Sequence, residues 1–350
     1  MSGPAPLGEW LRGTGPDAEV SICTRVRLAR NVQGYRFPTR MTSEEAAEVD
    51  RFVCSRLTSA ETGLDLSVVH LHDVPKIDRQ VLIERHLISR ELAGADRARS
   101  VAVDDDECIS IMVNEEDHIR AQVFHSGFQV EATYRDALRI DEAVLRVIPI
   151  AFSEEFGFLT SCPTNTGTGM RISAMLHLPG LVWADDIERA SNTAQKIHLA
   201  VRGLYGEGSR ALGDFYQVSN QVTLGRSDEQ IVEDVRVAVA RIIAWEREVR
   251  AALLDGDARA RTLDRVFRSL GVLQNARILT SDECLGCLSA VRFGVVQGLL
   301  PDLTVEQVNR VLMHAQPGHL QQFANAELTA VERDRRRADS VREILTRSHG

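Results

Sequence analysis

The chain has 350 residues, a net charge of −9 and 44% hydrophobic residues. Its length exceeds one typical domain, and its composition is that of a globular protein rather than a disordered one. The acidic balance argues against a broadly basic, nucleic-acid-binding surface, and no apolar run reaches membrane-spanning length. The first residues lack the basic start and apolar stretch of a secretion signal, so we expect a cytoplasmic protein with no direct nucleic-acid or membrane partner.

The first two-thirds of the chain alternates between predicted strands and helices. Residues 1–20 are rich in proline and glycine, and we expect a flexible arm there. Thr42, with Glu45 three residues later, predicts the start of a helix over 41–57. Short alternating or β-branched runs predict strands at 23–31, 64–71, 108–114, 119–124 and 216–224. Helical spacing of apolar residues predicts helices at 78–89, 141–152 and 184–201.

The last third of the chain has a purely helical pattern. Ser227 is a predicted N-cap, and the apolar residues that follow recur at helical spacing: Ile231, Val235, Ala238, Ile242 and Trp245. After this long helix, further helices are predicted at 262–270, 281–296, 304–315 and 328–347. We therefore expect a mixed domain over 21–256 and a helical domain over 257–350.

The six cysteines are too thinly scattered for a disulfide framework, so reduced thiols are expected. Cys284 and Cys287 form one C-x-x-C pair, but a second pair or a nearby histidine that would complete a zinc site is missing from the sequence. Their spacing is more typical of one turn of a helix.

The stretch SCPTNTGTGMRISAMLHL at 161–178 is the first candidate for anion binding. The sequence has no P-loop, so a nucleotide would need another phosphate grip. Arginine offers one, because its planar fork binds phosphate oxygens bidentately and stays charged. The glycine-containing turn lets backbone N–H groups approach an anion, with Arg171 following as a clamp. The same residues also fit an ordinary turn.

Three further stretches carry candidate site residues. VNEEDHIR at 113–120 follows an apolar strand, and strand alternation would place Glu116, His118 and Arg120 on one side. CTRVRLARN at 23–31 puts two arginines on one strand face, and VRGLYGEGSRALGD at 201–214 predicts a mobile loop with one acid. Each of these runs, taken alone, also fits a solvated turn or strand edge.

These stretches together resemble the McsB family of bacterial protein-arginine kinases. CTRVRLARN, VNEEDHIR, CPTNTGTGMR and YGEGSRALGD match its signatures in order, and the likeness covers nearly the whole chain. The resemblance implies an α+β catalytic domain of the phosphagen-kinase type, an antiparallel sheet flanked by helices, followed by an all-α domain. It also implies MgATP, whose phosphates would be bound by Arg25, Arg27, Arg79, Arg120, Arg171 and Arg202.

The resemblance assigns the reaction to a few further residues. Glu116 and Glu207 match the acids that engage the substrate guanidinium, and Cys162 matches the active-site cysteine. A guanidinium has a pKa above about 12 and is a poor nucleophile, so acids must orient it and accept its proton. Arginines and Mg²⁺ would neutralise the transferring phosphoryl group. No resident metal ligands are expected in the protein.

The helical domain carries a second implied site. ERDRRRA at 332–338 matches the family stretch for an activating phosphoarginine, with Arg333, Asp334 and Arg337 as its residues. Taken alone, this run also fits a solvated helix face with internal ion pairs. The resemblance further implies that this domain forms a homodimer, for which Val308, Leu312 and Met313 are candidates, although core packing explains them equally well.

The implied activity is phosphorylation of exposed arginines in proteins, which marks them for Clp-type proteolysis in stress response, with a McsA-type activator as a possible partner. The helical domain that precedes the first strand in small-molecule phosphagen kinases, roughly 100 residues and thus of ordinary domain size, is not found here. An open site would admit a protein side chain. The alternatives are a phosphagen kinase for a free guanidino compound and a phosphoarginine-binding adaptor with an inactive kinase site.

Overall fold

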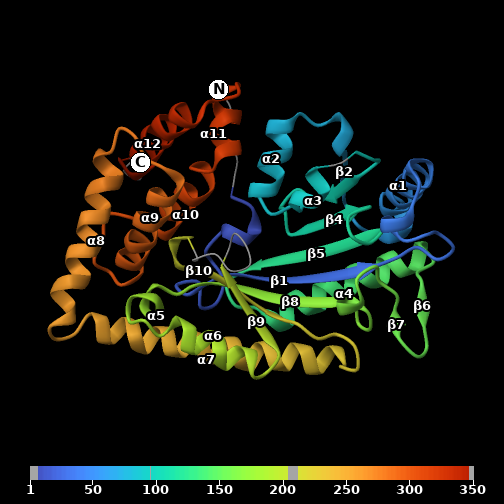
Figure 1. Ribbon diagram of the computed structural model, residues 1–350, viewed down its shortest axis with the longest axis horizontal. Helices are drawn as coiled ribbons and strands as arrows, with labels where there is room; N and C mark the ends of the chain where they lie inside the picture. The colour runs from blue at the N-terminus through green and yellow to red at the C-terminus, as the bar shows by residue number, and fades with distance from the viewer. Residues whose placement is uncertain (1–6, 95, 204–211, 347–350) are drawn as a thin grey trace.

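The computed structural model describes residues 7–94, 96–203 and 212–346, and a large antiparallel sheet lies at its centre (Figure 1). Eight strands follow the order β2-β3-β4-β5-β1-β8-β10-β9, and every neighbouring pair is antiparallel. From one edge to the other they are Ser67–His70, Ser100–Val103, Ile109–Val113, Ile119–Ser126, Ser21–Arg30, Met170–His177, Phe215–Asn220 and Leu199–Gly203. The predicted α+β class with an antiparallel sheet is confirmed.

Helices cover the sheet and form a separate layer toward the C-terminus (Figure 1). Those of the first region are α1 Ser43–Leu57, α2 Lys76–Glu84, α3 Arg90–Ala93, α4 Val130–Val147, α5 Pro179–Trp183, α6 Ile187–Gln195 and α7 Asp228–Leu253. Those of the last region are α8 Ala258–Asn275, α9 Ser281–Val296, α10 Val305–His314, α11 Pro317–Ala324 and α12 Ala330–Thr346. A small hairpin, β6 Phe152–Ser153 and β7 Gly157–Phe158, stands apart from the main sheet.

Side-chain alternation gives the central strands one apolar and one polar face. On β1, Val26 and Leu28 are buried in the core that also contains Ala137 of α4 and Val235 of α7. The intervening side chains therefore point to the opposite face of the sheet. That opposite face, away from α4 and α7, is free to carry polar residues.

Several predicted elements have different limits in the structure. The helix expected over 141–152 is α4, which begins at Val130 and ends at Val147. The helix expected over 184–201 is wrong at its end, because Leu199 starts β9 and pairs with β10. The apolar run Leu199-Ala200-Val201 fits the periodicity of a helix as well as that of a strand. It forms a strand because it pairs with the edge of β10.

The N-terminal segment does not behave as the flexible arm that we expected, at least from residue 7 onward. Trp10 and Leu11 are buried against residues of the C-terminal helices. The side-chain amide of Asn309 on α10 donates a 2.8 Å hydrogen bond to the Leu11 carbonyl. This early segment therefore connects the sheet with the helical region.

Val308, Leu312 and Met313, which we considered as interface residues, are buried inside the chain itself. They pack on the apolar side chains of α9 and α12, such as Leu288 and Val341. Core packing therefore accounts for all three, and a dimer interface would need other residues.

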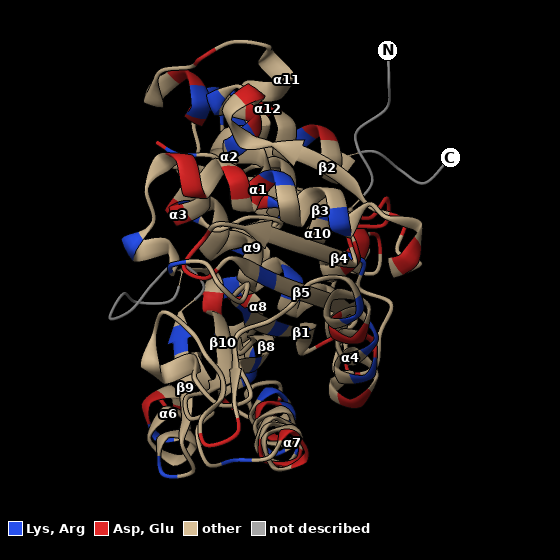
Figure 2. Ribbon diagram, turned by 90° about the vertical axis from the view of Figure 1, so that its right-hand side faces the viewer, with Lys and Arg blue, Asp and Glu red and all other residues tan. Residues whose placement is uncertain are grey.

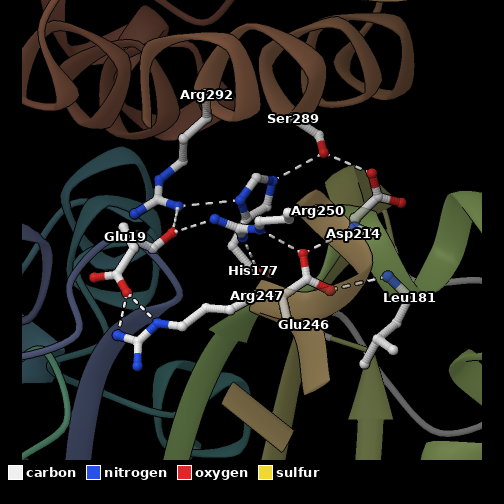
Figure 3. Close-up of polar contacts among 10 residues, drawn as sticks. Glu19, His177, Leu181, Asp214, Glu246, Arg247, Arg250, Ser289 and Arg292 are labelled. Carbon is white, nitrogen blue, oxygen red and sulfur yellow. Dashed lines mark hydrogen bonds and ion pairs between the residues drawn. The ribbon is translucent and has the colours of Figure 1, made fainter. Parts of the chain in front are cut away.

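A buried polar network joins α9 of the helical region to the sheet (Figure 3). Arg292 donates to His177 Nδ1 over 3.0 Å, and His177 Nε2 lies 2.9 Å from the Ser289 hydroxyl. Ser289 in turn donates to Asp214 over 2.5 Å. Burial and the charges of Arg292 and Arg250 lower the pKa of His177 well below its usual range, so the ring is neutral and can accept from Arg292.

Glu246 and Arg250 on α7 complete this network as a buried ion pair. Arg250 Nε donates to Glu246 over 2.6 Å, and the other two Arg250 nitrogens donate to backbone carbonyls. The carboxylate of Glu246 also accepts the N–H groups of Gly180 and Leu181 at the start of α5. The pair therefore fixes α5 on α7.

Among the residues described, no helix is both long and apolar enough to cross a membrane.

We expect Glu246→Gln to lower the free energy of unfolding by about 3 kcal/mol, because it leaves the Arg250 charge buried without its counter-charge. Chemical denaturation measures this change. Glu233→Gln is the matched control, since Glu233 lies on the same helix but is exposed and pairs with the solvent-accessible Arg236. Equal stability of the two variants would contradict the structural role of the buried pair.

Candidate active site

Arginines crowd the polar face of the central strands. Arg25 and Arg27 follow each other two residues apart on β1, and the pairing register places Arg27 directly opposite Arg171 on β8. Figure 2 shows blue segments on these central strands. Like charges opposite each other on a sheet are unfavourable, so this face is suited to an anion.

These arginines line an open cleft of about 540 Å³. The residues that surround it come from five strands, from α3 and from the turn between β4 and β5: Arg25, Arg27, Glu91, Glu115, Glu116, Arg120, Arg171, Arg202 and Gln217. The structure therefore brings together five of the six arginines that the sequence motifs suggested, and one of the two acids.

Hydrogen bonds hold several of these cations in place. Arg25 donates to the Gln217 side chain over 2.7 Å, and Arg171 donates to the Ser219 hydroxyl over 3.1 Å. Both acceptors lie on β10, at alternate positions that face the cleft. β10 thus orients Arg25 on β1 and Arg171 on β8.

The electrostatics of β1 also favour an anion in the cleft. Burial and the nearby charges of Arg120 and Arg171 lower the pKa of Arg25 to about 10. Burial and three neighbouring arginines lower the pKa of Arg27 well below its usual range, and its Nε atom is buried without a hydrogen-bond partner among the described residues. A bound anion would offset the repulsion among these arginines and would favour the charged forms of Arg25 and Arg27.

Arg120 has a closely bound carboxylate in the cleft. Its Nη1 lies 2.7 Å from both oxygens of Glu115. Burial acts against the charged form of Arg120, but Glu115 outweighs it and raises the pKa of the guanidinium. Glu115 cannot be singled out from the sequence, because adjacent acids in a turn give no signal of which one faces a partner.

Residues 114–118 form a turn that hydrogen bonds hold to neighbouring segments. Asn114 adopts a left-handed backbone conformation with φ of 59° and donates to the Ala46 carbonyl on α1 over 2.8 Å. Asp117 accepts a 2.6 Å hydrogen bond from the Asn31 amide and one of 2.7 Å from the Ser161 backbone N–H. Asp117 therefore joins this turn to the segment that contains Cys162.

Strand alternation predicted that His118 and Glu116 lie on the same side. The structure shows that they do not. The His118 ring is buried, Nδ1 accepts from the Val32 N–H over 2.9 Å, and Nε2 lies 2.9 Å from the Arg36 carbonyl. Alternation fails here because residues 114–118 form a turn and not a strand. The histidine is a support beneath the turn, and burial lowers its pKa to about 4.

Glu116 lies at the edge of the cleft, beside the segment around Cys162. The amide of Asn165 lies 3.5 Å from a Glu116 carboxylate oxygen. Cys162 is partly exposed, and its sulfur lies 3.0 Å from the Thr164 hydroxyl. Two of the sequence stretches that supplied candidate residues therefore meet at this point.

Two other predicted site residues have a different outcome. Arg79 does not line the cleft: it lies on α2 and donates to the Ala93 carbonyl over 3.0 Å, because the helix turns it toward the end of α3. Glu207 falls within 204–211 and lies outside the described residues.

The candidate residues on α12 are tied to the helical core. Arg337 is buried and donates to the carbonyls of Ala315 and Leu279 and to Asp334. Arg333 is half-buried and donates to the Leu328 carbonyl over 2.7 Å. Arg337 therefore has a structural role in this domain, while Arg333 and Asp334 are accessible.

A second cavity of about 650 Å³ adjoins the arginine cleft and shares Arg25, Arg27 and Arg120 with it. Its walls are more apolar and come from the N-terminal segment, the sheet and the helical domain, including Trp10, His86, Ile88, Met112, Leu285 and Met313. No sequence motif indicates this cavity, since residues far apart in the chain form it.

Two family models match the chain. Residues 48–249 match the ATP:guanido phosphotransferase C-terminal catalytic domain, and residues 259–349 match the protein-arginine kinase McsB C-terminal domain.

Relatives with a known name match almost the whole chain. A protein named protein-arginine kinase from Brevibacillus brevis is 43% identical over 97% of this chain and 96% of its own length. One with the same name from Moorella thermoacetica is 42% identical over 96% of this chain and 97% of its own.

Solved structures extend the likeness to the fold. A duplicated taurocyamine kinase from Schistosoma mansoni, with bound transition state analog components, has a TM-score of 0.60 and 26% identity. The match covers 70% of this chain and 35% of that one. A lombricine kinase has a TM-score of 0.59 and 25% identity, with 71% of this chain and 72% of that chain covered.

We expect inorganic tripolyphosphate to bind the cleft and raise the melting temperature, by mass action that reaches about 2.7 kcal/mol at 100 times the dissociation constant. Arg27→Gln should remove most of this shift, because Arg27 is partly buried in the cleft and lies near the charges of Arg25, Arg120 and Arg171. Arg79→Gln is the matched control and should keep the shift. A shift lost equally in both variants would place the anion elsewhere.

Proposed function

The chain belongs to the ATP:guanido phosphotransferase family, and specifically to its protein-arginine kinases, and on this basis we propose that it transfers the γ-phosphoryl group of ATP to arginine side chains of proteins. The observation that carries the proposal is the cleft in which five arginines surround an open space with Glu116 at its edge. Positioning and charge neutralisation supply most of the catalysis in phosphoryl transfer, and this arrangement provides both.

The nucleotide would occupy the two adjoining cavities. Its triphosphate would lie among Arg25, Arg27, Arg120, Arg171 and Arg202, and its nucleoside in the more apolar cavity beside His86. Both Glu115 oxygens are engaged by Arg120. A magnesium ion would therefore be held mainly by phosphate oxygens and water, and it would neutralise charge on the phosphoryl groups.

Glu116 is placed to receive the substrate guanidinium. In the proposed reaction its carboxylate binds the fork of the arginine and orients one nitrogen toward the γ-phosphorus. The N–P bond forms as the bond from phosphorus to the ADP oxygen breaks, and a proton of the attacking nitrogen passes to a carboxylate. By resemblance Glu207 would be the second acid, and Cys162 would lie against the guanidinium.

The alternative substrate is a free guanidino compound. The relatives at 39–43% identity over almost the whole chain are named protein-arginine kinases, whereas the taurocyamine and lombricine kinases are more distant, at 25–26% identity. The match of residues 259–349 to the McsB C-terminal domain also favours the protein substrate. The retained cleft arginines and Glu116 favour an active kinase over an adaptor with an inactive site.

The wider role remains part of the proposal. We place the protein in the cytoplasm, where its product would mark proteins for Clp-type proteolysis under stress and where a McsA-type activator would act on it. A homodimer formed by the helical domain would use exposed apolar side chains, of which the described part of that domain offers Phe267, Ile278, Phe323 and Val331.

We expect the chain to transfer the γ-phosphoryl group of ATP, supplied as labelled MgATP, to casein, and to transfer much less of it to free arginine. Glu116→Gln should reduce kcat by about 100-fold or more with an unchanged melting temperature, because it removes a proton acceptor at a half-exposed position. The label must be measured near neutral pH, since the N–P bond is labile in acid. Glu142→Gln, exposed on α4, is the control and should retain activity.

Label found only on free arginine would reject the protein substrate, and full activity of Glu116→Gln would reject the role of this acid.

For the helical domain, we propose that free phosphoarginine binds at Arg333 and Asp334 and activates the enzyme. Arg333→Gln should weaken its binding in calorimetry by about tenfold or more, since a charge-assisted hydrogen bond is lost. Arg335→Gln, exposed on the same helix, should leave it unchanged. Unchanged affinity in Arg333→Gln would contradict this site.

A further inference from the structure

A cluster of three potential metal ligands lies where α1 meets the edge strand β2, apart from the arginine cleft. Asp50 and Cys54 lie one turn apart on α1, and His70 is the last residue of β2. One oxygen, one sulfur and one nitrogen of these side chains all lie within 4.8 Å of one another. Asp50 and Cys54 are buried, whereas His70 faces solvent on one side.

The cluster is incompletely satisfied by the protein alone. Ser100 of β3 is paired with His70 across the sheet, and its hydroxyl lies 2.8 Å from His70 Nδ1. Asp50 and Cys54 also interact with this hydroxyl. This hydroxyl has a single proton, so it can donate to only one acceptor atom, and an ionised carboxylate such as that of Asp50 has two oxygens that accept and none that donates.

Asp50 shows the consequence of this shortage. Its side chain is 6% exposed, and its Oδ1 atom is buried without a hydrogen-bond partner in the part of the chain that the structure describes. The other oxygen, Oδ2, lies 3.6 Å from His70 Nδ1. Buried carboxylates are normally paired, hydrogen-bonded or bound to a metal, so the free oxygen indicates a missing ligand.

We propose that Asp50, Cys54 and His70 bind a Zn²⁺ ion. A thiolate, an imidazole and a carboxylate form the mixed donor set that suits zinc, whereas Mg²⁺ and Ca²⁺ prefer oxygen alone. Zinc–ligand bonds of about 2.0–2.3 Å place the ligand atoms of a tetrahedral site roughly 3.5 Å apart. The three side chains would have to approach by about 1 Å, which the partly exposed His70 can provide.

The fourth position would face solvent. His72 lies on this side, with its ring centroid 5.8 Å from that of His70, and its side chain is 62% exposed. Either a water molecule or His72 could complete the tetrahedron. The same opening gives the ion a route from solvent to the buried pair on α1.

The charges of the site balance when the ion is bound. Burial raises the pKa of the Cys54 thiol to about 12, so in the metal-free protein this group is protonated. On binding, the S–H proton leaves to solvent and the Zn–S bond forms in its place. The thiolate and the carboxylate then offset the two positive charges of the ion.

The position of the site suggests a structural effect. Ala46, one turn before Asp50 on α1, accepts the hydrogen bond of Asn114 at the start of the turn that contains Glu116. A bound ion would tie α1 to the edge of the sheet and so stabilise the support of this turn.

The full-length protein, stripped of metal with a chelator, should bind one Co²⁺ per chain and show the ultraviolet band of a cobalt–thiolate bond. Zn²⁺ should displace the cobalt and abolish the band. Cys54→Ser should lose the band, and His70→Gln should weaken binding by about 100-fold or more. Cys287→Ser on α9 is the matched thiol control and should keep the band.

Circular dichroism of each variant shows whether it is folded, and His70→Gln is informative even if Cys54→Ser is unstable, since His70 lies partly in solvent. Absence of cobalt and zinc binding to the stripped wild-type chain would overturn the proposal. So would a band retained in Cys54→Ser, full affinity in His70→Gln, or a band lost in Cys287→Ser alone.

Discussion

The constraint on which the site depends is the crowding of like charges on one face of a sheet. Arg27 lies directly opposite Arg171, with Arg25 two residues away, and Arg120, which is bound by the Glu115 carboxylate, lines the same cleft. Such an arrangement costs folding free energy and persists because the apolar faces of the same strands pack on α4 and α7. The core thus supports a charged surface that an anion would stabilise.

The helical domain packs against the sheet and is not a loosely attached unit. The Arg292–His177–Ser289–Asp214 chain crosses from α9 to the sheet (Figure 3), and the core around Trp10 and Leu11 continues into α10. The second cavity has walls from both regions. A change in the position of α9, α10 or α11 would therefore change the walls of this cavity, which adjoins the arginine cleft.

Sequence reasoning succeeded where periodicity and local signals agree. The capping box at Thr42, the helix over 281–296 and the N-cap at Ser227 are found at or near the predicted positions. It failed where the same residues fit two structures, as at Leu199, and where a turn interrupts alternation, as at His118. It also placed Arg79 in the cleft by motif position, whereas a helix directs that side chain toward the Ala93 carbonyl.

The sequence by itself determined most helices and strands, including the helical pattern after residue 257, because such patterns require only local geometry, and the resemblance of its motifs to a known family indicated the class of protein. The tertiary structure alone decided which of these residues meet. Gln217 and Ser219 orient Arg25 and Arg171 across long chain separations, Glu115 instead of its neighbour binds Arg120, and Asp50, Cys54 and His70 come together from two elements. Such contacts depend on strand order and helix packing, which no local pattern encodes.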